Sequence, residues 1–127
     1  MKTATIFLSI TIFMGVALAF LMNNNSSDVT SGNNVSMEDG KQIVEVMAKG
    51  GYLPRISLAK ADTPTILKVN TKGTFDCSAS LTIPRLNYYA LLPPSDVTEI
   101  EIPPQKAGTT IQGLCSMGMY SFQIKFS

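Results

Sequence analysis

The sequence predicts an all-β domain, an antiparallel sandwich or barrel, behind an apolar N-terminal segment. From Lys41 to Ser127, short runs rich in β-branched and aromatic residues are interrupted by Gly or Pro every eight to twelve residues. The run 98–102 alternates strictly between charged or polar residues and isoleucines, as a half-buried strand does. No helix start signal followed by a long apolar stripe lies in this range. With 127 residues, the chain has room for one ordinary domain.

The first four expected strands are bounded by turn-forming residues. In chain order these runs are 42–47, 56–58, 65–70 and 80–83. Gly50 and Pro54 separate the first run from the second, and Gly73 follows the third. Pro84 ends the fourth run because proline cannot donate a hydrogen bond to a β-ladder.

The C-terminal half of the domain predicts three further strands. These runs are 98–102, 109–114 and 122–126. Pro103 ends the first of them, and Gly108 marks the turn into the second. For residues 88–92, which are aromatic and aliphatic, we expect a strand that covers the core, with an exposed docking patch as the alternative.

The N-terminal segment Thr3–Met22 carries no charge and predicts one hydrophobic helix. At about 1.5 Å per residue, such a helix spans a hydrocarbon core of about 30 Å. Ala17-Leu18-Ala19 also fits the cleavage pattern of a secretory signal, so a retained anchor and a cleaved signal both remain open. Lys2 orients the body away from the cytoplasm. We therefore expect a membrane-anchored domain outside the cytoplasm, or a secreted or periplasmic one after cleavage.

Residues 23–40 are dominated by Asn, Ser, Gly and acidic side chains, which predicts a polar, flexible linker. The chain thus divides into a membrane anchor or signal peptide (1–22), a linker (23–40) and a β-domain (41–127).

Composition excludes several classes of function. Ten basic and nine acidic residues give a net charge of +1, too small an excess to favour nucleic acid as a partner. The absence of histidine excludes Ser-His-Asp and Cys-His catalysis, His-ligated zinc and blue copper of the His₂Cys kind. No enzyme signature is present, and we expect no catalytic activity.

Sulfur is the main soft donor left in the chain. Cys115, Met117 and Met119 occupy every second position, so their side chains share a face if the segment stays extended. Cys77, the only other cysteine, precedes an expected strand that can lie beside this one. Thiolate and thioether ligands select Cu(I) over hard cations. A disulfide between the two cysteines of an exported domain is the alternative. A redox role for the pair lacks the Cys-x-x-Cys spacing.

Four separated stretches carry a resemblance to a known family. They are Gly51-Tyr52-Leu53-Pro54, Cys77 with Leu81-Thr82-Ile83-Pro84, Ala107-Gly108, and Cys115-Ser116-Met117-Gly118-Met119. Over 42–127 the chain resembles the cupredoxin-like domains of the plastocyanin and azurin superfamily. It is most similar to a His-lacking, exported branch with G-Y-x-P, C-x5-I-P and C-x-M-G-M motifs. The resemblance implies a Greek-key β-sandwich that holds copper at one end.

The resemblance also implies a metal site. Cys77 takes the place of the first ligand, which is usually His, and Cys115 takes the thiolate position. Met117 and Met119 fall where the second His and the axial Met would be. The expected function is extracytoplasmic copper binding, with Cu(I) favoured, for buffering, delivery or resistance. Expected partners are the membrane, through residues 3–22, and a copper-transport protein. The alternative is a metal-free structural or interaction module with a Cys77–Cys115 disulfide.

Overall fold

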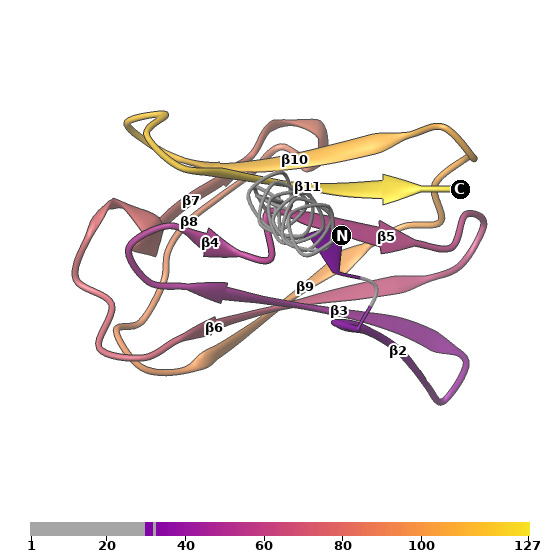
Figure 1. The fold of residues 1–127 in the computed structure, drawn as a ribbon, viewed down its shortest axis with the longest axis horizontal. Coiled ribbons are helices and arrows are strands. Elements are labelled where there is room, and N and C mark those ends of the chain that lie inside the picture. Colours follow the sequence, from indigo (N-terminus) through magenta and orange to yellow (C-terminus); the bar gives the residue numbers. More distant parts are fainter. Residues whose placement is uncertain (1–29, 32) are drawn as a thin grey trace, which may run out of the picture.

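The computed structural model describes residues 30–31 and 33–127, and these form a two-layered β-sandwich (Figure 1). The described residues contain eleven strands and two short 3₁₀ helices. In chain order the elements are β1 (Thr30–Ser31), β2 (Val35–Glu38), β3 (Lys41–Ala48), β4 (Tyr52–Leu53), β5 (Ile56–Ala59), β6 (Thr65–Thr71), η1 (Cys77–Ala79), β7 (Ser80–Ile83), η2 (Pro84–Leu86), β8 (Tyr88–Leu91), β9 (Val97–Ile102), β10 (Thr110–Cys115) and β11 (Ser121–Phe126). The predicted helix over 3–22 lies outside the described residues.

The strands divide into two sheets. The first has the order β1-β5-β11-β10-β7-β8, and the second has the order β2-β3-β6-β9, with β4 paired to β3. Three of these pairings, β1 with β5, β5 with β11 and β3 with β6, are parallel and join strands that are not consecutive in the sequence. No helix in the described part of the chain is long and apolar enough to cross a bilayer.

Every run that the sequence predicts as a strand forms one, to within a residue or two at each end. The inner faces of both sheets meet in one core, which is fully buried at its centre. Its residues with 0% exposure are Val44, Val46, Ala48, Leu67, Val69, Leu81, Ile83, Ile111, Cys115 and Ile124. The apolar residues whose alternation predicted the strands are thus the ones that are buried between the sheets, and their burial stabilises the sandwich.

The structure differs from the predicted linker over 23–40, because β2 extends the second sheet into that range. Val35 pairs with Val44 and Glu38 pairs with Lys41 in an antiparallel ladder. Asp39 and Gly40 connect the strands with φ values of 50° and 76°. Positive φ at both central residues is what a tight hairpin turn requires, and Asp-Gly is a strong sequence signal for it. We predicted a linker because the polar composition of residues 23–40 outweighed this turn signal.

The segment 88–92 is only partly the core cover that we expected. It forms β8 at the edge of the first sheet, and alternate residues face opposite ways. Tyr88 and Ala90 pack against the core, whereas Tyr89 and Leu91 are 66% and 75% exposed. Leu92, directly after the strand, is buried.

Tyr52 fixes the segment η1 to the end of the core. Its side chain is 3% exposed, and its ring meets that of Phe122 edge-on with centroids 5.0 Å apart. Its hydroxyl donates a hydrogen bond to the Ser78 carbonyl oxygen at 3.0 Å. Burial, with a smaller contribution from the negative charge of Asp76, raises the pKa of Tyr52 to about 12.

Gly113 is required by the Phe122 ring. The two residues face each other across β10 and β11, and a Cβ at position 113 would overlap the Cε1 and Cζ atoms of the ring. We expect Gly113→Ala to lower the free energy of unfolding by about 1–3 kcal/mol, because overpacking shifts a buried ring. Urea denaturation measures the change. Thr110→Ala, at an exposed position on the same strand, is the control, and an unchanged midpoint for Gly113→Ala would contradict the assignment.

Removing the Tyr52 hydroxyl has a pH-dependent consequence. We expect Tyr52→Phe to cost about 1 kcal/mol of stability near neutral pH through loss of the Ser78 hydrogen bond. Because the pKa of Tyr52 is raised to about 12 in the folded state, the native protein holds this proton more tightly than the unfolded chain. The contribution is complete below pH 10 and is lost as the pH rises toward 12. Stability measured across that window should fall more steeply for the parent than for Tyr52→Phe, and parallel curves would refute the pKa assignment.

Candidate metal centre

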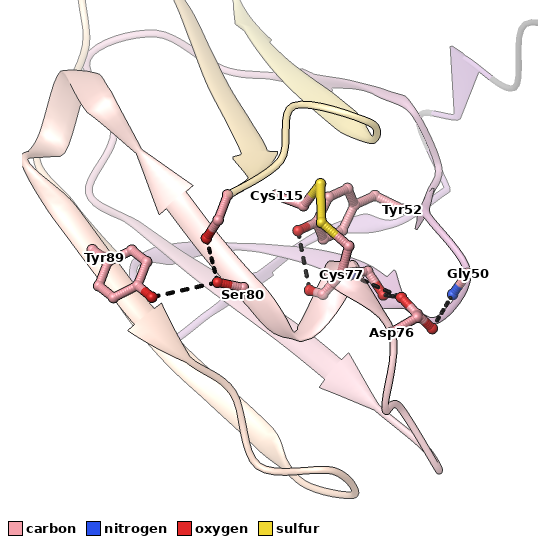
Figure 2. The surroundings of a disulfide bond; sticks show 9 residues. Gly50, Tyr52, Asp76, Cys77, Ser80, Tyr89 and Cys115 are labelled. Carbon is pink, nitrogen blue, oxygen red and sulfur yellow. Dashed lines mark hydrogen bonds between the residues drawn. A yellow bond between two sulfur atoms is a disulfide. The ribbon is translucent and has the colours of Figure 1, made fainter.

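The two cysteines lie together at one end of the sandwich and form a disulfide (Figure 2). Cys115 is the last residue of β10, where it pairs with Leu81 of β7. Cys77 begins η1, which leads directly into β7. Their Cα atoms are 5.7 Å apart. Of the two states left open by the sequence, thiolates or a disulfide, the structure contains the disulfide.

Met117 and Met119 lie in the loop between β10 and β11, beside the disulfide. Their side chains are 77% and 67% exposed, whereas Cys115 is fully buried. The loop is tight: Gly118 N–H donates to the Cys115 carbonyl at 2.8 Å, and Cys115 N–H donates to the Tyr120 carbonyl at 3.0 Å. The segment therefore curls after Cys115, and the structure places all four sulfur residues at this end. Their roles as metal ligands stay predictions.

Asp76 holds the chain in place directly before Cys77. One carboxylate oxygen accepts hydrogen bonds from the Ser78 backbone N–H and hydroxyl, and the other accepts from Gly50 N–H at 2.9 Å (Figure 2). These hydrogen bonds hold the pKa of Asp76 below its ordinary value, and the bond from the Ser78 hydroxyl has the largest effect. Asp76 thus ties the cysteine segment to the turn between β3 and β4.

Three hydroxyl groups form a row next to Cys115. The Ser80 and Ser116 hydroxyls are hydrogen-bonded to each other, and the Tyr89 hydroxyl lies 3.5 Å from that of Ser80. Hydrogen bonding to Ser80, and then to Ser116, lowers the pKa of Tyr89. In Figure 2, Ser80 and Tyr89 of this row lie to one side of the disulfide, with Tyr89 on the neighbouring strand β8.

Sequence reasoning missed Asp76 and the hydroxyl row for different reasons. An Asp two residues before a Ser is a local capping pattern, so the Asp76 and Ser78 pair had a readable signal. The hydroxyls come from separate segments that only the sheet register brings together. Among residues 30–31 and 33–127, no group of three or more His, Cys, Asp or Glu could hold a metal ion.

No family model and no curated protein matches this chain. Among solved structures, it is similar to the metal-binding domain of the Cu(I)-exporting P-type ATPase CopA of Streptococcus pneumoniae D39, solved with Cu(I). The TM-score is 0.65 at 18% identity, over 73% of this chain and 92% of that domain. It is also similar to a copper binding protein solved by NMR in the apo form, with a TM-score of 0.67 at 24% identity over 76% of this chain and 98% of the other.

Auracyanin B aligns more loosely, with a TM-score of 0.44 at 12% identity over 76% of this chain and 96% of that one. At these identities, the two closer likenesses establish architecture. The cupredoxin-like fold that the four sequence stretches predicted is confirmed: this chain has the fold of these copper-binding domains.

Proposed function

We propose that this chain is a Cu(I)-binding domain, anchored in a membrane with its β-sandwich outside the cytoplasm, that buffers copper or passes it on. The observation that carries the proposal is the gathering of Cys77, Cys115, Met117 and Met119 at one end of the sandwich. The copper-binding domains that share the fold support the choice of metal.

The donor set fits Cu(I) better than other metals. Thiolate and thioether sulfurs are soft ligands, and Mg²⁺ and Ca²⁺ take oxygen ligands instead. The chain lacks histidine, so a His₂Cys centre for Cu(II) electron transfer is not available to it. Cargo binding therefore suits the site better than electron transfer, and we propose no catalytic step.

The site fits the ion only when the disulfide is reduced. In the oxidised protein each cysteine sulfur is bonded to the other, and neither is a thiolate. Reduction by a dithiol releases two thiols, and each must lose its proton to bind metal. Binding should therefore weaken as the pH falls. The exposed thioethers of Met117 and Met119 suit ligand exchange with a copper-transport protein, the partner that we propose.

Cu(I) titration of the reduced full-length protein tests this function. In competition with a chromogenic Cu(I) chelator under anaerobic conditions, we expect Cys115→Ser to weaken binding by at least about tenfold, the loss seen even when an outer partner of a metal ligand is removed. Met119→Leu should also weaken binding, because leucine removes the sulfur and keeps the bulk. Met37→Leu, at an exposed position on β2, is the matched control.

Two results would end the copper proposal. One is binding by Cys115→Ser that is as tight as in the parent. The other is equal binding by the oxidised and reduced proteins, because the oxidised form has no free thiol among the described residues.

A second candidate function is a metal-free module stapled by the disulfide. The disulfide itself favours this candidate, since it joins η1 to β10 across 38 residues and Cys115 is fully buried. A closed loop of that length stabilises a fold by about 4 kcal/mol in the chain-entropy model.

A thiol count on protein purified in air, together with stability before and after reduction, tests the structural disulfide. For a structural staple, we expect no titratable thiol and a loss of about 4 kcal/mol of unfolding free energy on reduction. Two free thiols in the native protein, or a reduced form of unchanged stability, would remove the case for the staple.

A further inference from the structure

Four exposed apolar side chains surround the disulfide end of the sandwich. This apolar rim consists of Leu53, Phe75, Met117 and Met119, which are 56%, 84%, 77% and 67% exposed. Leu53 and Met119 line one depression of about 320 Å³ between β4 and the loop after β10. Phe75 adjoins Asp76, whose carboxylate binds the Gly50 N–H of the turn before β4. The rim thus comes from three segments that the depression and the hydrogen bond from Gly50 to Asp76 place at the same end of the sandwich.

Three cations flank the apolar rim. Lys49, Arg55 and Lys72 are exposed and lie on the segments that carry the rim. Arg55 lines the same depression as Leu53 and Met119. In the described part of the chain, the ion pairs are those of Lys68 with Glu38 and Glu99, so the three flanking cations have no carboxylate partner there. Unpaired cations around exposed apolar side chains fit a surface that is both anionic and apolar.

Asp76 and Asp96 lie at the rim end, and four other carboxylates gather on the outer face of the second sheet. Its exposed carboxylates are Glu38, Glu45, Glu99 and Glu101. Only Lys68, at the centre of that face, is paired with any of them. A molecule with this asymmetry takes a preferred orientation beside a negatively charged surface, with the acidic face turned away.

The N-terminal chain enters the domain near the rim. β1 runs parallel to β5, and Thr30 pairs with Ile56, three residues after Leu53. Residues 23–29, which separate this point from the apolar segment Thr3–Met22, reach at most about 25 Å when fully extended. An anchored domain is therefore held close to the bilayer, and the side that carries Leu53 is within reach of it.

We infer that the rim end of the sandwich lies against an anionic lipid bilayer, with the apolar rim among the headgroups and Lys49, Arg55 and Lys72 against lipid phosphates. The inference rests on the membrane anchor of the proposed function and is independent of copper. It adds a contact made by the folded domain itself. For the proposed copper site, this contact would place exchange with a copper-transport protein at the membrane surface.

Methionine methyl NMR on the full-length, metal-free protein in phosphatidylglycerol nanodiscs tests the orientation. A lipid with a gadolinium-chelating headgroup broadens signals near the bilayer. We expect the methyl signals of Met117 and Met119 to broaden strongly and that of Met37 to broaden little. Met37 is a matched reference because it is also exposed, at 58%, but lies in the hairpin at the other end of β3. Single Met→Leu variants assign the signals.

Charge variants test the lipid contact. Replacing Lys49, Arg55 or Lys72 with Gln removes one positive charge. For each cation removed, we expect the ratio of domain in contact with the bilayer to domain away from it to fall by about fivefold. Lys106→Gln, an exposed position in the loop between β9 and β10, should leave the ratio unchanged. Replacing phosphatidylglycerol with phosphatidylcholine should reduce the broadening in the parent and have less effect on the triple variant.

Several results would overturn the inference. Equal broadening of Met37 and Met119 would show no preferred orientation. Insensitivity to both lipid charge and the three Gln variants would point to coverage of the rim by residues 1–29 or by a second copy of the chain. Protein that stays out of the nanodiscs would remove the anchor and the inference with it. Failure of the Cu(I) titration alone, with the broadening pattern intact, would refute copper binding and leave this contact standing.

Discussion

The register of β7 on β10 decides where the sulfur atoms lie. Cys115 pairs with Leu81, and the Ser116 N–H donates to the Ser80 carbonyl one step further along the ladder. Side chains alternate faces along a strand, so a slip by one residue would turn Cys115 from the core to the outer face and away from Cys77. Neither the disulfide nor a shared metal site would then form. The chemistry at this end depends on a backbone alignment.

That alignment is held by the core rather than by the cysteines. Leu81 and Ile83 of β7 and Ile111 of β10 are fully buried, and a slip would expose those of the strand that moved. The Phe122 ring occupies the space above Gly113 and so adds a steric lock between β10 and its other neighbour, β11. Exposing these side chains in a slipped register would cost more free energy than one disulfide contributes. Their burial therefore fixes the register. We therefore expect the segments that carry Cys77 and Cys115 to stay side by side when the disulfide is reduced.

The sequence predicted the strands well because apolar and polar residues alternate along each strand, and buried and exposed side chains alternate in the same way in the folded sandwich. It predicted the end at which Cys115, Met117 and Met119 lie, since three of the four sulfurs share one short segment. It did not predict the hydroxyl row or the link from Asp76 to Gly50, because those contacts join segments that only the register brings together. The hairpin at Asp39-Gly40 was a different kind of omission: its signal was local, but polar composition around it outweighed the turn chemistry.

The four sulfur-containing side chains differ in solvent exposure. This difference affects how they bind a metal ion more than the number of sulfur atoms does. Cys115 is fully buried and Cys77 half-buried, whereas both methionines project from the loop. Thioethers need no deprotonation, while each thiol must be released from the disulfide and lose a proton before it binds. An ion that approaches from outside therefore meets the neutral, exposed donors first and the charged, buried donors last. In the proposed function, the methionine loop determines how copper is captured and exchanged, and the oxidation state of the cysteines determines whether it is retained.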